Sequence, residues 1–86
     1  MEIKIGCISH YYDRIGVAVL SLTDSLQLGD MVHIIGSATD VAQEIASMEI
    51  EHEKVSAVSP GDEVALKVIE PVRKGDTIYK IILESS

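Results

Sequence analysis

The residues whose types suit covalent chemistry are few and widely spaced in this sequence of 86 residues. Cys7 is the single cysteine, and it precedes His10 by three positions. A reactive thiolate needs an electropositive and partly exposed setting. Cys7 instead shares strand parity with Ile3 and Ile5, and no basic side chain is placed to activate it. We therefore expect Cys7 to be an inert core residue and not a nucleophile.

The densest group of metal-donor side chains consists of Glu49, Glu51, His52 and Glu53. The three histidines, at positions 10, 33 and 52, lack the short spacing of metal ligands. On a strand, His52 points away from the glutamates, so the run is more simply interpreted as a solvated acidic rim. A metal-binding or enzymatic role built on His52 is the weakest hypothesis, and we expect no cofactor.

The composition excludes several classes of function. The chain carries 14 acidic and 7 basic residues, for a formal charge of −7, which argues against a DNA partner and leaves only weak RNA contact. Its length fits a single domain, residues 1–86, with no room for a separate catalytic domain. The lone cysteine, together with the lack of a signal-peptide pattern or a long apolar run, predicts a cytoplasmic protein without membrane contact.

The apolar residues are mostly β-branched Ile and Val, which favours an all-β fold. Apolar patterning and turn signals predict strands at 3–9, 15–22, 31–35, 63–68 and 77–83. In the first strand Ile8 breaks the parity, and Gly6 indicates a bulge or a close backbone approach. The second and last strands are apolar on both faces, so one aliphatic face of each is left for a partner.

A short pattern, Gly-Asp-x-(Val or Ile), opens three of these strands. It occurs at Gly29-Asp30, Gly61-Asp62 and Gly75-Asp76. Glycine accepts the positive φ of a tight turn, and aspartate accepts hydrogen bonds from nearby backbone amides. The unequal spacing of the three copies indicates recurrent turn chemistry and not an internal repeat.

Residues 40–52 allow two interpretations. Val41, Ile45 and Met48 have helical spacing, which favours an amphipathic helix. The alternative is a long strand with a bulge near its middle, which also turns these three side chains inward. Periodicity leaves both open, although the alternation over 49–53 predicts a strand for the second half.

The order of these segments resembles a known family. A strand ending in His10-Tyr11-Tyr12 is followed by Ile15-Gly16-Val17-Ala18-Val19, by Leu28-Gly29-Asp30-Met31-Val32-His33-Ile34, by Met48-Glu49-Ile50-Glu51-His52-Glu53, and finally by Ile78-Tyr79-Lys80-Ile81. This series, over residues 3–83, resembles the second domain of translational GTPases such as elongation factor Tu and initiation factor two. It is also similar to small stand-alone proteins like that domain, and a related barrel ends some collagenase-like peptidases.

The resemblance implies a closed six-stranded Greek-key barrel, with a strand and not a helix at residues 40–48. A closed barrel has no free edge on which an Ile- and Val-rich chain could aggregate. The sequence contains no Gly-x-x-x-x-Gly-Lys-(Ser/Thr) phosphate loop, so we expect no GTPase activity. The expected function is a non-enzymatic binding module for a protein or ribonucleoprotein partner, with a role in translation.

Six residues are candidates for partner binding: Tyr11, Tyr12, Arg14, Leu20, Arg73 and Lys74. Tyrosines beside an arginine in a loop suit stacking on bases or on a peptide. Leu20 represents the aliphatic face of the second strand, and Arg73 and Lys74 belong to the more basic stretch 67–80. The alternative expectation is a structural barrel that forms a homo-oligomer through its outward aliphatic strands.

Overall fold

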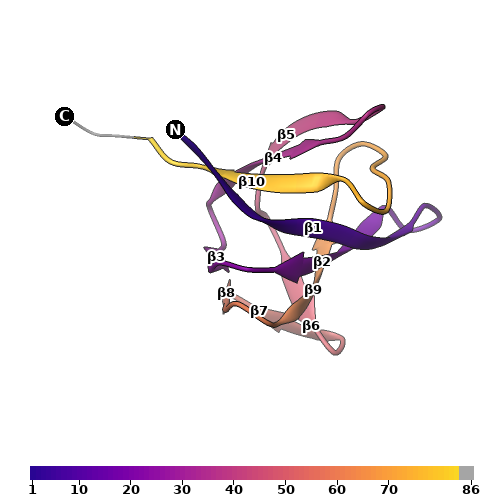
Figure 1. Cartoon of the computed structure of the whole chain (residues 1–86). Helices are drawn as coiled ribbons and strands as arrows, with labels where there is room; N and C mark the ends of the chain where they lie inside the picture. The colour runs from indigo at the N-terminus through magenta and orange to yellow at the C-terminus, as the bar shows by residue number, and fades with distance from the viewer. Residues whose placement is uncertain (84–86) are drawn as a thin grey trace.

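The computed structural model describes residues 1–83, and these residues form strands and no helix. The strands are β1 (Glu2–Tyr12), β2 (Val17–Leu22), β3 (Leu26–Gln27), β4 (Met31–Ile35), β5 (Asp40–Glu44), β6 (Met48–Ile50), β7 (Glu53–Val55), β8 (Ala57–Val58), β9 (Glu63–Lys67) and β10 (Thr77–Ile81), drawn in Figure 1. The prediction of an all-β fold is confirmed. The described residues contain no helix of the length and apolarity that crossing a membrane would require.

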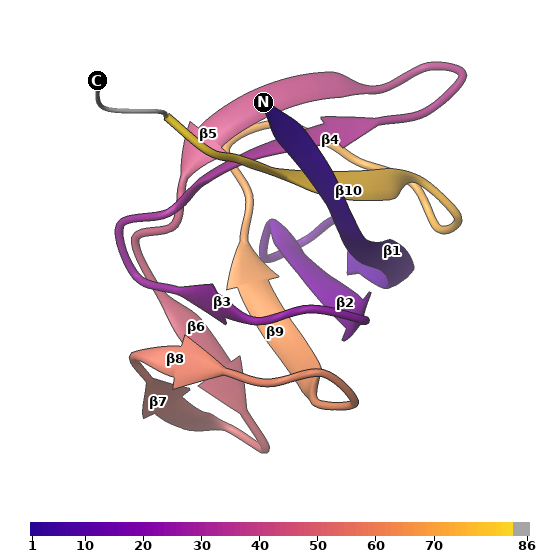
Figure 2. The same cartoon turned by 60° about the vertical axis from the view of Figure 1, so that its left-hand side comes forward.

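Antiparallel pairing joins eight strands into one sheet in the order β5-β4-β10-β1-β2-β9-β6-β7, and β3 pairs separately with β8. β5 stands at one end of this order and β6 near the other, although only residues 45–47 separate them along the chain. The sheet is therefore strongly curved. Figure 2 shows the chain descending from β5 directly into β6.

Strand β1 changes parity along its length because its pairing shifts register twice. One shift falls between Lys4 and Gly6 against β10, and the other falls between Ile8 and His10 against β2. After the first shift Ile8 is buried, while Cys7 lies exposed on the outer surface. The expectation that Cys7 belongs to the core is wrong, because simple alternation does not continue across a bulge.

Residues 40–50 form two strands, so the helical alternative is wrong. β5 pairs with β4, β6 pairs with β9, and residues 45–47 bend between the two strands. Val41, Ile45 and Met48 are all buried. The bend inserts one extra residue into the inward–outward alternation. The three buried residues therefore have the spacing of a helix, although they lie on or beside strands.

The prediction of a strand over 49–53 is only partly right, because a tight turn interrupts it. Ile50 pairs with Glu53 across the β6–β7 hairpin, and the two residues between them form its loop. Glu51 and His52 both have positive φ, at 49° and 68°. Two consecutive positive φ values are the signature of a type I′ hairpin turn, whose favoured residues are asparagine and glycine.

The core is aliphatic and lies inside the curved sheet. Its fully buried large side chains are Ile5, Ile8, Leu20, Leu26, Ile34, Ile45, Met48, Leu66, Ile78, Val32 and Val64. In β2 the residues Ala18, Leu20 and Leu22 face this core, so the outer face of the strand carries Val17 and Val19. Leu20 therefore cannot contact a partner, and its choice as a binding residue is wrong.

Three turns with the same hydrogen bonds precede β4, β9 and β10. In each turn the aspartate N–H donates to the carbonyl three residues earlier, and the aspartate carboxylate accepts from that residue's N–H. The carboxylate contacts are Asp30 with Gln27 (3.0 Å), Asp62 with Ser59 (2.9 Å) and Asp76 with Arg73 (2.7 Å). The glycines before the aspartates have φ of 90°, 92° and 93°, as the third position of a type II turn requires.

A buried amide links β5 to the last residue of β9 and to the chain that follows it. Gln43 Nε2 donates to the Lys67 carbonyl at 2.9 Å, and Gln43 Oε1 accepts from the Ile69 N–H at 2.9 Å. Gln43 is only 6% exposed, so water cannot easily replace either bond. Within residues 1–83, β5 and β9 share no backbone ladder, and this side chain makes the connection instead.

Candidate functional site: a groove on the outer face

A groove of about 650 Å³ lies on the outer face of the sheet, across β2, β9 and β6. Its floor includes Val17, Val19 and Ala65. Val19 pairs with Ala65 across β2 and β9, and Ala65 in turn pairs with Glu49 of β6. Ala65 has the smallest side chain of this row, so the surface is hollowed between its two neighbours.

The end of β1 and the turn after it form one wall of the groove. Tyr12 and Ile15 line this wall and are 49% and 58% exposed, which leaves a large apolar area in contact with solvent. The Tyr12 ring is tilted against the His10 ring, with centroids 4.3 Å apart. Lys67 Nζ donates to the Ile15 carbonyl at 3.1 Å and thereby ties the turn to β9.

The opposite rim of the groove is acidic. Glu49 and Glu63 lie on β6 and β9, and Glu51 and His52 form the β6–β7 turn that stands beside them. Within residues 1–83, no hydrogen bond or ion pair joins these three carboxylates to another side chain. The groove therefore combines an apolar floor with carboxylates that are available to a ligand.

Of the six residues chosen from the sequence as binding candidates, Tyr12 lines the groove. Tyr11 is half-buried against the core, and Leu20 is fully buried in it. The other three are exposed turn residues that do not line the groove: Arg14, Arg73 and Lys74. The basic stretch is also divided, because Lys67 Nζ donates to the Ile15 carbonyl and Lys80 Nζ to the Ser25 carbonyl.

Sequence reasoning missed most of the groove, including Val17, Val19 and Ala65 on its floor. The signal was present in β9, where alternation marks Ala65 as outward, but not in β2, where both faces are apolar and alternation alone does not show that Val17 and Val19 face outward. Their assembly depends on the pairing of β2 with β9, which joins segments far apart in the sequence. Alternation within one strand carries no information about that register.

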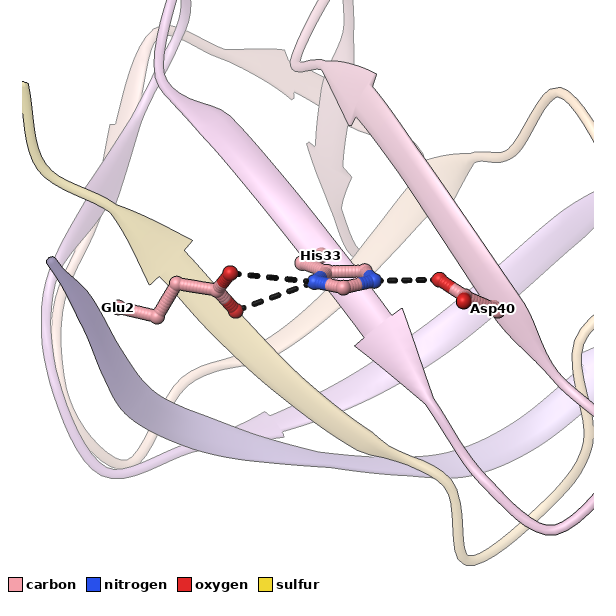
Figure 3. A network of polar contacts seen from close by, with 3 residues as sticks. All are labelled: Glu2, His33 and Asp40. Carbon is pink, nitrogen blue, oxygen red and sulfur yellow. Dashed lines mark hydrogen bonds and ion pairs between the residues drawn. The ribbon is translucent and has the colours of Figure 1, made fainter.

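A second polar cluster lies on the opposite part of the sheet and is shown in Figure 3. His33 of β4 stands between Glu2 of β1 and Asp40 of β5. Its Nδ1 lies 3.1 and 3.3 Å from the two Glu2 carboxylate oxygens, and its Nε2 lies 2.5 Å from Asp40 Oδ1. Both ring nitrogens can donate only when the imidazole is protonated.

The carboxylates raise the pKa of His33 above its ordinary value of 6.5. The hydrogen bond with Asp40 is the main cause, the bond and charge of Glu2 add to it, and partial burial opposes it. The side chains of His33, Glu2 and Asp40 are 22%, 42% and 82% exposed, so solvent screens the interaction. The cluster is best described as a surface ion-pair network that joins three strands.

His52, the residue of the metal hypothesis, lies in the exposed β6–β7 turn. Among the residues that the structure describes, no group of three His, Cys, Asp or Glu side chains is placed to hold a metal ion. In the His33 cluster both ring nitrogens already face carboxylate oxygens.

The fold and the groove together define a small antiparallel β domain with a ligand-sized hollow on its outer face. A solved structure, the C-terminal domain of a Geobacillus thermoleovorans protein assigned to the U32 peptidases, superposes with a TM-score of 0.86. That superposition covers 93% of each chain at 22% sequence identity. The selenomethionine variant of the same domain gives a TM-score of 0.82 over 87% of this chain and 95% of the other. These likenesses establish the fold.

Two curated relatives extend the comparison to sequence. A Methanocaldococcus jannaschii protein named as an uncharacterized protease is 35% identical over 79 residues, or 91% of this chain. A Porphyromonas gingivalis collagenase is 30% identical over 81 residues, or 92% of this chain. The chain spans 19% and 20% of the lengths of these relatives. No family model matches the chain.

The comparisons correct the interpretation drawn from the sequence. The expected relationship to the second domain of translation factors is wrong, because the similar proteins are a protease, a collagenase and the C-terminal domain of a U32 peptidase. The expected translation-related binding module is overturned by the same findings. The expectation of a non-enzymatic protein is contradicted as well, because both curated relatives bear the names of proteolytic enzymes.

Proposed function

We propose that this chain is the accessory β domain of a U32-type peptidase system and helps to hold the protein on which that system acts. The observation that carries the proposal is the superposition on a peptidase C-terminal domain, which covers 93% of both chains. Because the other chain is itself a C-terminal domain, this coverage supports the proposal that residues 1–86 form a single domain. The sequence similarity to a protease and a collagenase over nine-tenths of the chain supports the same assignment.

The chemistry of the residues that line the outer groove also supports the proposal. Recognition sites are often concave and largely apolar, with a few polar groups that fix the orientation of the ligand. Val17, Val19 and Ala65 supply the apolar floor, and Glu49 and Glu63 supply polar groups at the rim. A protein partner, which the sequence already suggested, is part of this proposal.

A domain-exchange experiment tests the proposal. The matched 81-residue segment of the Porphyromonas collagenase is deleted, or is replaced by this chain, and cleavage of a collagen peptide is measured for both proteins. We expect the deletion to lower kcat/KM and the replacement to restore at least part of the loss. A replacement protein that folds, as its thermal melting would show, yet cleaves no better than the deletion would contradict the proposal.

We also propose that the sheet closes into the six-stranded Greek-key barrel expected from the sequence. When β5 and β6 are treated as one bent strand, the order β4-β10-β1-β2-β9-β6 returns through β5 to β4, which supports closure. The Gln43 bonds to Lys67 and Ile69 lie at the seam and support it as well. Amide hydrogen exchange tests this, because Ile69 should be protected in the native protein and should exchange much faster in Gln43→Ala. An Ile69 amide that exchanges at the rate of an open loop in the native protein would argue for an open sheet.

A cytoplasmic location remains part of the proposal. Its support is the single cysteine, Cys7, which is exposed and has no second cysteine with which to form an internal disulfide. Fractionation of native cells with an antibody against the chain tests it. Recovery of the chain outside the cytoplasmic fraction would contradict it.

A further inference from the structure

We propose that the outer groove binds an extended peptide segment in which aliphatic side chains alternate with lysine or arginine. The inference deepens the proposed function by naming the class of protein segment that the domain holds, and in that sense it rests on the proposed function. The occupant is a partner of stated chemistry, and the charge of the groove and the shape of its floor identify it.

The floor of the groove accepts aliphatic side chains. Val17, Val19 and Ala65 present a strip of small apolar groups, and the exposed Tyr12 and Ile15 stand along one side of it. In an extended peptide alternate side chains share one face, so two aliphatic residues separated by one position reach such a strip together. Placing them there removes apolar area from water on both partners.

The rim of the groove selects the charge of the ligand. Glu49, Glu51 and Glu63 are three carboxylates, and the single lysine that lines the groove, Lys67, directs its ammonium toward the Ile15 carbonyl. The chain as a whole carries −7, which adds long-range attraction for a cation. With the aliphatic residues on the floor, lysine and arginine start on the outward side of the extended peptide, and their long flexible stems let the charged ends bend back to the carboxylates at the rim.

A comparison with the carboxylates of the His33 cluster favours the groove as the binding site for a cationic peptide. At the His33 cluster the carboxylates of Glu2 and Asp40 are already engaged by the imidazole. The groove carboxylates have no such side-chain partner within the described residues. A cationic peptide should therefore respond to the groove and not simply to the negative charge of the molecule.

The test is a titration of the isolated 86-residue chain followed by two-dimensional amide NMR. The probe is the acetylated and amidated peptide Lys-Val-Lys-Val-Lys. The controls are Glu-Val-Glu-Val-Glu, which keeps the aliphatic residues, and Lys-Ser-Lys-Ser-Lys, which keeps the charge. We expect saturable shifts at Val17, Val19 and Ala65 with the probe, weaker binding of the serine peptide, and no binding of the acidic peptide.

Matched variants separate the groove from general electrostatics. Glu49→Gln, Glu51→Gln and Glu63→Gln in one protein should weaken probe binding at least about fivefold at low salt. The control carries Glu44→Gln, Glu53→Gln and Glu70→Gln, which change the net charge equally but lie outside the groove, and it should bind within about twofold of the native chain. Ala65→Leu fills the hollow and should abolish the shifts without altering the thermal melting temperature.

Several outcomes would overturn the inference. These are equal loss in the two charge variants, equal response to the acidic peptide, or shifts centred on the His33 cluster. Shifts at the groove that depend on protein concentration without peptide would identify a second copy of the chain as the occupant instead. The titration uses the chain alone, so its failure leaves the domain-exchange result intact. Failure of the domain exchange alongside successful peptide binding would remove the peptidase assignment only.

Discussion

Carboxylates accept hydrogen bonds in two parts of this molecule, one within a turn and one between strands, and their surroundings differ. In the turn before β10, Asp76 is 6% exposed and accepts a bond from the Arg73 backbone N–H at 2.7 Å. In the His33 cluster, Asp40 is 82% exposed and contacts an imidazole from the neighbouring strand. The first bond satisfies a backbone donor with a carboxylate that is largely shielded from water, whereas the second is formed by a carboxylate that water surrounds. Burial and the nature of the partner, more than the length of the bond, should decide how much each contributes to stability.

The largest effect is expected at Asp76. Asp76→Ala should lower the free energy of unfolding by about 2–3 kcal/mol, because it removes the buried carboxylate that accepts the partly buried bond from the Arg73 N–H. The matched control is Asp62→Ala, which removes the equivalent 2.9 Å bond to the Ser59 N–H. Asp62 is half-exposed, so water can replace its carboxylate and the loss should be about 1 kcal/mol. Urea denaturation of the two variants measures both values, and equal losses would show that burial does not set the difference.

A substitution at Gly61 tests the backbone conformation of such a turn without removing the carboxylate of Asp62. Gly61→Val should cost about 1–3 kcal/mol, because φ is 92° and a β-branched residue adopts that conformation poorly. A Cβ at this position meets no atom within 4 Å, so the penalty comes from the backbone alone. Gly61→Asn, which tolerates positive φ better, is the control and should cost less. Thermal denaturation that ranks the asparagine variant below the valine variant would contradict the assigned turn geometry.

These turns also show how far the sequence determines the fold. The Gly-Asp pattern marks the places where strands β4, β9 and β10 begin, because its chemistry is local to four residues. Whether the aspartate of a given copy is buried depends on residues far away in the sequence. Asp76 is covered because its carboxylate packs over Gly36 of the β4–β5 connection, whereas Asp62 has no such cover. Identical short patterns therefore predict the same bonds and not the same energies.

The groove shows the same limit at the level of the site. Tyr12 was identifiable because an aromatic residue in a polar connection stands out by type. Ala65 was not, because its importance lies in being small between Val19 and Glu49, which become its neighbours only through strand pairing. Cys7 was misplaced for a related reason, since the register shift at Gly6 reverses which residues face inward. Long-range register and bulges are the information that alternation along one strand cannot supply.

The β6–β7 turn has neither a glycine nor an aspartate that bonds the backbone. Here a glycine can be introduced, and we expect it to stabilise the fold. His52 has φ of 68°, which costs a non-glycine residue about 1 kcal/mol or more. His52→Gly should therefore raise the free energy of unfolding by about 0.5–1 kcal/mol, after the greater flexibility of glycine in the unfolded chain is subtracted. His10→Gly, within the extended strand β1, is the control and should destabilise. Urea denaturation in which both variants lose stability would show that the positive φ at His52 carries no strain.

The smallest effect on the free energy of unfolding is expected in the exposed His33 cluster, and it should depend on pH. The pKa of His33 is raised above 6.5 in the folded chain, mainly by Asp40. The imidazolium therefore stabilises the fold fully below pH 6.5, as long as the carboxylates are ionised, and this contribution disappears as the pH rises through the raised pKa. His33→Gln should lower the free energy of unfolding by about 0.5–1 kcal/mol near pH 6 and by less at pH 9.

The control for this last prediction is Asp40→Asn, which keeps the shape of the contact but removes its main charge. It should lower the pKa of His33, measured by NMR titration of the imidazole, and should shift the pH-dependent loss of stability to lower pH. A difference between native and His33→Gln proteins that stays constant from pH 6 to pH 9 would mean that packing and not charge accounts for His33. The distinction between the His33 cluster and the Asp76 turn would then rest on the burial of their side chains alone.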